Sequence, residues 1–204
     1  MIKDLILKAH PRAEMANGSP YDHEDIYIAD FTERTKERDN KRSIEVSGEN
    51  QVCPITGMPM DSVVFHNPTN MKVEFVKYHD KDFQNILKKP IKHCEGSLFV
   101  ADEYDISWIV MLELKDCKPP KVRSHAYKAR RQIYNVTKDL RDRGILTKEK
   151  VYGIYSCPQK HTSYNSMVFG GSIEQTRWKK YTGIIFVGTN EVMLTDKETC
   201  SPQI

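Results

Sequence analysis

Alternating and continuous apolar runs divide the chain from residue 71 onward into strand-like segments. Runs of apolar, β-branched and aromatic residues bounded by polar or turn residues indicate strands. Such runs occupy residues 71–78, 94–101, 106–115, 151–156 and 183–194. The last is long enough for a hairpin with Gly188 to Asn190 as its turn. A short helix is expected over 82–89, ended by Pro90.

One long amphipathic helix separates the third and fourth of these segments. Apolar residues recur at helical spacing in the list Val122, Ala126, Ala129, Ile133, Val136 and Leu140, and Gly144 supplies a stop. A strand, a crossover helix and another strand favour parallel pairing. The pattern therefore predicts an α/β fold with a mixed central sheet flanked by helices. We expect a single domain over 1–204, with its core at about 71–194 and an N-terminal elaboration over 1–70.

The run Ile106 to Lys115 ends with two charged residues, Glu113 and Lys115. Residues two apart in a strand share a face, so the carboxylate and ammonium should lie side by side. The simplest interpretation is a weak ion pair at a solvated rim. Burial of an unpartnered charge costs several kcal/mol. An apolar strand that ends with a carboxylate and an ammonium therefore also indicates a partner for them, such as a metal ion or a polyanion.

The preceding run begins at Cys94-Glu95 and is joined to this one by a polar turn. A three-residue turn at 103–105 would set Glu95 directly opposite Glu113, with β carbons about 5 Å apart. A change of register by one residue would place Glu95 on the other face. Asp105 is the alternative second carboxylate. In a continuous strand, however, it would lie roughly 26 Å from Glu113, and no Gly or Pro breaks the run.

This arrangement resembles the PD-(D/E)XK nuclease superfamily, which has an acidic residue on one strand, E-x-K on the next, then a helix and a further strand. The matching residues are Glu95, Glu113-Leu114-Lys115, the helix around Gln132, and Val151 to Ser156, within residues 80–157. The first acidic position is usually Asp, and here it is Glu95. The resemblance implies a restriction-endonuclease-like core.

The resemblance also implies an activity, a magnesium-dependent endonuclease acting on DNA. Mg²⁺, or Mn²⁺ in its place, would be held by Glu95, Glu113 and the carbonyl of Leu114. Lys115 would act on the attacking water and the phosphate, and Gln132 would complete the site. Homodimers and roles in restriction or anti-phage defence are common in this superfamily. The alternative, favoured by Glu95 in place of Asp, is an inactive nuclease-like module that binds nucleic acid or protein.

Charge is concentrated in one segment of the chain. Residues 118–143 contain nine Lys or Arg and two Asp, a net charge of +7, whereas the whole chain carries +3. Such a run is often only a solvated helix face, but here it begins close to Lys115. We therefore expect Lys121, Arg123, Lys128 and Arg131 to contact phosphates. A later loop, 161–171, offers Tyr164 or Phe169 for base stacking, unless it covers its own core.

Composition argues against a membrane protein, a structural zinc site and a disulfide-rich secreted protein. No apolar stretch approaches the about 18 residues that span a membrane, and Lys3, Asp4 and Lys8 interrupt the first residues. The five cysteines are scattered without a C-x2-C pair, so a structural zinc site and a disulfide framework are not expected. We expect a cytoplasmic protein with no membrane partner.

Overall fold

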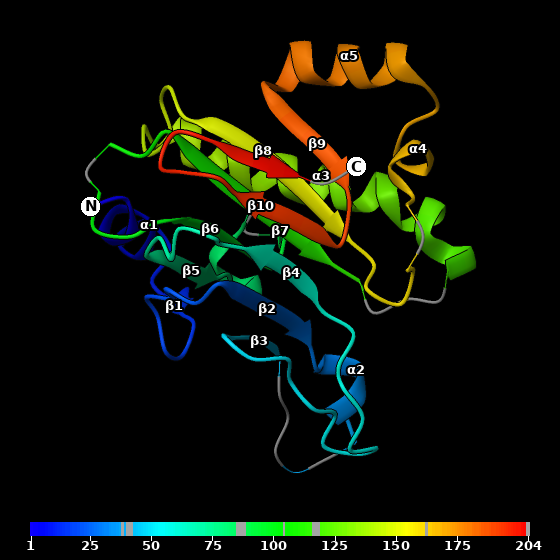
Figure 1. Ribbon diagram of the computed structural model, residues 1–204. Coiled ribbons are helices and arrows are strands. Elements are labelled where there is room, and N and C mark those ends of the chain that lie inside the picture. Colours follow the sequence, from blue (N-terminus) through cyan, green and yellow to red (C-terminus); the bar gives the residue numbers. More distant parts are fainter. Residues whose placement is uncertain are drawn as a thin grey trace.

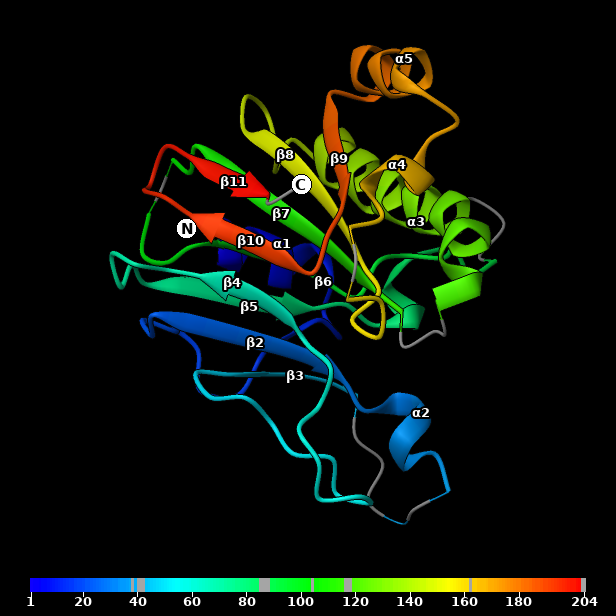
Figure 2. The same ribbon diagram turned by 45° about the vertical axis from the view of Figure 1, so that its right-hand side comes forward.

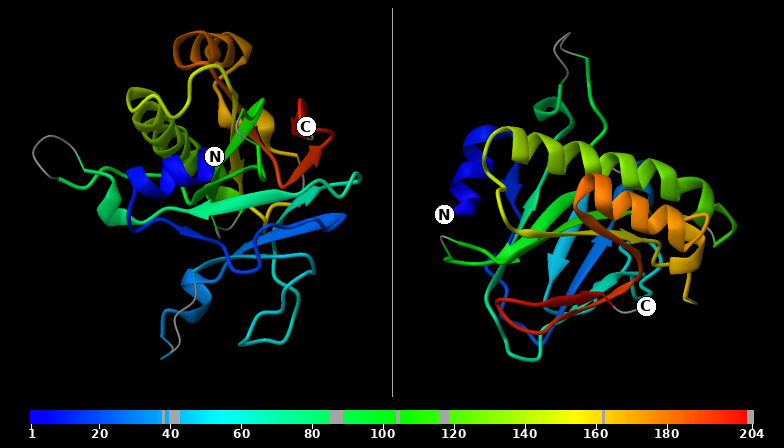
Figure 3. Two further views of the ribbon diagram at one scale, coloured as in Figure 1. Left: turned by 90° about the vertical axis from the view of Figure 1, so that its left-hand side faces the viewer. Right: turned by 90° about the horizontal axis from the view of Figure 1, so that it is seen from above.

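The fold consists of two packed β-sheets and a layer of helices. The structure, a computed structural model, describes residues 1–37, 39, 43–84, 89–103, 105–115, 119–161 and 163–202. The helices cover one face of the larger sheet, and the smaller sheet covers its other face (Figures 1 and 3). The protein is thus α/β with a mixed sheet, as the pattern of apolar residues predicts.

The larger sheet has six strands in the order β1-β5-β6-β7-β8-β9. Their bounds are β1 (Glu14–Met15), β5 (Val73–Lys77), β6 (Gly96–Val100), β7 (Trp108–Leu114), β8 (Lys150–Ser156) and β9 (Ile184–Gly188). β5, β6 and β7 pair antiparallel, whereas β7, β8 and β9 pair parallel. The carboxyl ends of β7, β8 and β9 therefore meet at one edge, which also receives the amino end of β6.

Four helices of the described residues lie on one side of the larger sheet. They are α1 (Ile2–Ala9), α3 (Val122–Asp142), α4 (Asn165–Val168) and α5 (Ser172–Thr182), while the short α2 (Thr32–Thr35) follows the second sheet. The buried positions of α3 include all six residues of the predicted apolar stripe, and Gly144 follows the helix with a left-handed φ of 69°. The extent of this helix and its buried face are confirmed.

The smaller sheet covers the face on which the sequence predicted further helices. Its five strands run in the order β11 (Cys200–Pro202), β10 (Glu191–Leu194), β4 (Val63–His66), β2 (Asp25–Asp30) and β3 (Ile44–Ser47). Apolar residues of both sheets, such as Ile26, Phe65, Val110 and Leu112, form one core between them. A sheet buries an apolar face as well as helices do, so the pattern of β7 did not distinguish the two.

Two local predictions are wrong. Residues 183–194 do not form a hairpin, because β9 belongs to the larger sheet and β10 pairs with β4 in the smaller one. The helix expected over 82–89 is replaced at its start by a 3₁₀ turn, Asp80–Asp82, and an extended Phe83. Residues 85–88 of that prediction lie outside the described residues. Among the described helices, none is long and apolar enough to cross a membrane.

Candidate active site

The strand β7 carries Glu113 into the interior of the protein. All seven residues of β7 are buried, because helices cover one face and the smaller sheet covers the other. Ile109 and Met111 point to the helices, and Glu113 shares their face by the two-residue period of a strand. A carboxylate is thus held at the end of an apolar strand with no access to solvent.

The pairing of β6 with β7 sets Glu95 beside Glu113. Gly96 pairs with Leu112, and Ser97 pairs with Met111. The next step in this register places Glu95 opposite Glu113, and the Glu95 N–H donates to the Leu112 carbonyl over 2.9 Å. The predicted register is confirmed. A Cβ at Gly96 would lie 2.4 Å from the Val76 carbonyl, so only glycine permits this close approach of β6 to β5.

The ammonium of Lys115 lies between the two carboxylates. Its Nζ is 2.5 Å from Glu113 Oε1 and 3.7 Å from Glu95 Oε1. Burial lowers the pKa of Lys115, but the charges of Glu113 and Glu95 outweigh that effect and raise it overall. Lys115 therefore stays protonated, and the three groups together carry one excess negative charge when both carboxylates are ionised.

Both carboxylates resist ionisation in the absence of a metal ion. Burial, followed by the charge of Glu95, raises the pKa of Glu113 to about 8. Burial also raises the pKa of Glu95, to about 7. Neither oxygen of Glu113 receives a well-oriented hydrogen bond from the described residues. A buried carboxylate in this state is stabilised by any further cation that reaches it.

These shifts predict how stability depends on pH without divalent metal. The folded protein retains a proton on Glu113 that the unfolded chain loses near its ordinary pKa, so the free energy of unfolding falls as pH rises. Between pH 5 and pH 8 we expect a loss of about 3 kcal/mol attributable to Glu113. Urea unfolding in EDTA measures it, and Glu113→Gln should remove the contribution of Glu113 to the slope while that of Glu95 remains. An equal slope in the variant would contradict the assignment.

Helix α3 brings Gln132 to the same place. The Gln132 Nε2 donates to the His93 carbonyl over 2.7 Å, and its amide lies close enough to Glu113 to lower the pKa of that carboxyl. Asn135, one turn further on, donates to the Lys92 carbonyl over 2.7 Å. The helix is thus fixed to the segment that leads into β6, and Gln132 joins the group as the sequence predicted.

A cleft of about 570 Å³ opens onto this group. Glu95, Lys115 and Gln132 line it, together with basic side chains Arg12, Lys77 and Lys92 and acidic side chains Glu14, Asp30 and Asp80. Of the last three, Asp30 acts on both Glu95 and Lys115, raising the pKa of each. Asp30 could not be assigned to the site from the sequence, because it ends β2 in the smaller sheet and is distant from Glu95 in the chain.

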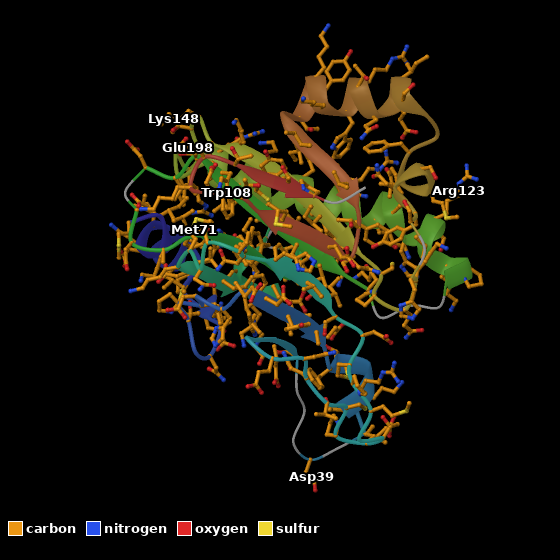
Figure 4. The ribbon with its side chains drawn as sticks, viewed as in Figure 1. Asp39, Met71, Trp108, Arg123, Lys148 and Glu198 are labelled. Carbon is orange, nitrogen blue, oxygen red and sulfur yellow. The ribbon has the colours of Figure 1, made fainter. Side chains whose placement is uncertain are left out.

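Asp105 is not part of this group. It precedes β7 at the end opposite Glu113, is exposed, and pairs with Lys148 over 3.6 Å. Figure 4 shows Lys148 and Arg123 at opposite sides of the molecule, and Arg123 lies in the first turn of the helix that follows Lys115. β7 runs without a break, so Asp105 as the alternative carboxylate is wrong.

The basic residues of α3 fall on different sides of the helix. Lys121 and Lys128 lower the pKa of His125 together with Lys115, after the larger effect of burial, so they lie near one another on one side of the helix. Arg123 and Arg131 are exposed elsewhere on the helix. The loop residues Tyr164 and Phe169 are buried in the core beneath α3 and α4, which excludes them from stacking on bases in this conformation.

The carboxylate oxygens of Glu95 and Glu113 are the kind of ligand that a hard divalent cation prefers. Among the described residues, no three His, Cys, Asp or Glu side chains lie close enough together to hold a metal ion. Glu95 and Glu113 therefore offer two carboxylates and no third side chain of these types. Mg²⁺ commonly binds through one or two carboxylates only. Comparison with known proteins adds nothing to this geometry: no protein-family model, no curated protein and no solved structure matches the chain.

Proposed function

We propose that this protein is a magnesium-dependent endonuclease of the PD-(D/E)XK type that hydrolyses phosphodiester bonds of DNA. The observation that carries the proposal is the position of Lys115 between Glu113 and Glu95 at the open end of an antiparallel strand pair. The order β6, β7, α3, β8 also agrees with the acidic strand, E-x-K strand, helix and parallel strand of a restriction-endonuclease-like core.

The metal would be held by Glu95, Glu113 and the carbonyl of Leu114. These are oxygen ligands, and Asp30 adds negative charge to the cleft without belonging to the pair. Bound Mg²⁺, or Mn²⁺ in its place, lowers the pKa of a water molecule and offsets charge on the phosphate. The raised pKa values of both glutamates imply that metal binding releases protons and strengthens with rising pH.

Lys115 and Gln132 would act on the water and the phosphate. Lys115 is partly exposed to the cleft and stays charged, so its ammonium can orient the attacking water and stabilise negative charge as it develops on the phosphate. The Gln132 amide is fixed by the His93 carbonyl and can hold a second water beside Glu113. Each group is placed by an element of the sheet or by α3, which keeps the geometry rigid.

Phosphates on either side of the cut would meet the basic side of α3. Replacing Lys121 and Lys128 with Ala should weaken binding to any sequence and lower the slope of log K against log salt by about 0.9 for each lost contact. Fluorescence anisotropy at several salt concentrations measures it. Lys138→Ala is the matched control, because Lys138 pairs with Asp142 at the far end of the helix. If the parental protein, the Lys121/Lys128 double variant and Lys138→Ala all have the same slope, DNA does not contact this side of α3.

The second candidate is a nuclease-like module without catalysis. Two features favour this candidate. Glu95 stands in the usual position of Asp, and Lys115 pairs with both carboxylates, so its charge offsets theirs without a metal ion. A calorimetric titration with Mn²⁺ separates the two functions, since an inactive module has no need of the metal. We propose dimeric action and a role in restriction or anti-phage defence only for the endonuclease, and not for the inactive module.

Digestion of a supercoiled plasmid tests the proposed activity. With Mg²⁺ the protein should nick or linearise the plasmid, and with EDTA the plasmid should stay supercoiled. Equal digestion in both conditions would indicate a contaminating or metal-independent nuclease. No digestion, with tight binding to DNA, would favour the module.

A further inference from the structure

A second cavity, of about 530 Å³, lies on the outer face of the smaller sheet. Tyr27 of β2, Val64 of β4 and Glu191 of β10 line it, and they are paired in one row across the three strands. Figure 2 shows these strands side by side. Their neighbours Ile26 and Phe65 belong to the core between the sheets, so the row points outward. Among the described residues, none lines both this cavity and the cleft.

The carboxyl ends of two parallel strands of the larger sheet form another wall of the cavity. Gly188 ends β9, and Pro158 follows the end of β8 by two residues. Ligands of proteins with parallel sheets commonly bind outside the carboxyl ends of the strands. The volume of the cavity also falls in the range of about 300–1,000 Å³ that is usual for small-molecule sites. Position and size therefore both indicate a binding site for a small molecule.

Asn190 fixes the loop that follows β8. Its Nδ2 donates to the carbonyls of Cys157 and Lys160 over 3.2 Å and 2.9 Å. Its Oδ1 accepts hydrogen bonds from Ser156 Oγ over 2.9 Å and from the Tyr164 hydroxyl over 2.7 Å. Asn190, Lys160 and Tyr164 all line the cavity. The protein's own hydrogen bonds thus hold this wall in place, and small-molecule sites are largely preformed in the same way.

Charged groups of both signs line the cavity, and they come from two parts of the fold. Asp61 and Glu191 provide carboxylates beside β4 and β10, and neither side chain has an ion-pair or hydrogen-bond partner in the described part of the chain. Lys160 and His161, from the loop after β8, provide an ammonium and an imidazole. Carboxylates repel a purely anionic ligand, and Lys160 repels a polyamine. The ligand should therefore carry N–H donors at one end and an anionic group at the other.

We propose that this cavity binds a guanine nucleotide, either free or at the end of a nucleic-acid strand. The Tyr27 ring offers a surface on which a flat base stacks. Neighbouring strands lie about 4.8 Å apart, so Glu191 is about 10 Å from Tyr27 across the row. A purine that stacks on Tyr27 and extends over Val64 therefore turns its edge toward Glu191 and Asp61.

Guanine fits this edge better than the other bases. Its N1–H and its amino group are adjacent donors that one carboxylate accepts together, whereas uracil and thymine offer a single N–H there. Lys160 and His161 would hold the phosphate. The proposal does not depend on the activity of the cleft.

Calorimetric titration of the full-length protein with guanosine 5′-monophosphate (GMP), without Mg²⁺ or DNA, tests it. GMP should bind at least about tenfold more tightly than uridine 5′-monophosphate (UMP). Asp61→Asn should weaken GMP binding about tenfold or more, the scale of one hydrogen bond to a charged group. Tyr27→Leu should weaken it about as much, because stacking is lost. Lys160→Ala/His161→Ala should bind GMP no more tightly than guanosine.

Asp105→Asn is the matched control, because Asp105 is exposed before the start of β7. It should bind GMP like the parental protein, and every variant should keep the parental unfolding midpoint. GMP binding that survives in Asp61→Asn and Tyr27→Leu but is lost in Glu95→Gln would place the nucleotide in the cleft and overturn the proposal. Equal affinities for GMP and UMP would overturn it as well.

A single-stranded trinucleotide that begins with 5′-phosphorylated deoxyguanosine separates the two sources of the group. Tighter binding than GMP, still dependent on Asp61, assigns the cavity to the end of a strand, and weaker or equal binding assigns it to a free nucleotide. A parental protein that binds neither GMP nor the trinucleotide through Asp61 would contradict both.

Discussion

Glu113→Gln should remove Mg²⁺-dependent cleavage while making the metal-free protein more stable. The substitution keeps the shape of a fully buried side chain but removes the charge that burial and Glu95 oppose. We expect cleavage to fall by at least about 10², the scale on which one electrostatic contribution to catalysis is lost. Metal affinity should fall with it, because one of two carboxylates is gone.

The opposite signs of the two effects make this variant informative. A merely damaged fold would lose stability and cleavage together, whereas Glu113→Gln should lose only cleavage. Urea unfolding at pH 8 in EDTA and single-turnover cleavage in Mg²⁺ give the two values. Asp105→Asn, exposed before the start of β7, is the control and should match the parental protein in both. A Glu113→Gln protein that cleaves at the parental rate would remove Glu113 from the site.

Lys115→Ala should separate metal binding from catalysis. Both carboxylates remain, so calorimetry should still detect Mn²⁺ binding, while cleavage should fall by about 10² or more. The metal-free variant should also lose stability at pH 8, because the ionised fraction of Glu95 and Glu113 is left without its cation. At pH 5 the loss should be smaller, because the raised pKa of Glu113 lets the carboxyl accept a proton instead.

The double variant Glu113→Gln/Lys115→Ala completes the comparison. It removes the buried charge together with its partner, so its stability should recover to within about 1 kcal/mol of Glu113→Gln while cleavage stays lost. If the change in stability of the double variant equals the sum of the two single changes, the two side chains do not interact in solution. Loss of Mn²⁺ binding in Lys115→Ala would contradict the division of roles between carboxylates and lysine.

Local rules account for the part of the site that the sequence predicted. The two-residue period of a strand put Glu113 and Lys115 on one face, and the length of the turn set the register that brings Glu95 opposite. The helical period of α3 placed Gln132 at the edge of its apolar stripe. These features depend on residues close together in the chain, so they could be inferred before the fold was known.

Long-range pairing accounts for what the sequence did not show. The smaller sheet joins β2, β3 and β4 to β10 and β11 from the other end of the chain, and no local pattern encodes that pairing. Asp30 reaches the cleft only through this sheet. The apolar run of β7 showed that both faces are covered, but a sheet and a layer of helices bury such a strand equally well.

The cleavage rate of one DNA duplex by three proteins tests the central claim most directly. The parental protein, Glu95→Gln and Asp105→Asn are compared at saturating Mg²⁺, with EDTA as the blank. We expect the parental protein and Asp105→Asn to cleave at equal rates, and Glu95→Gln to cleave about 10²-fold more slowly or worse. A Glu95→Gln protein as active as the parental one, or a parental protein without Mg²⁺-dependent cleavage, would contradict this expectation.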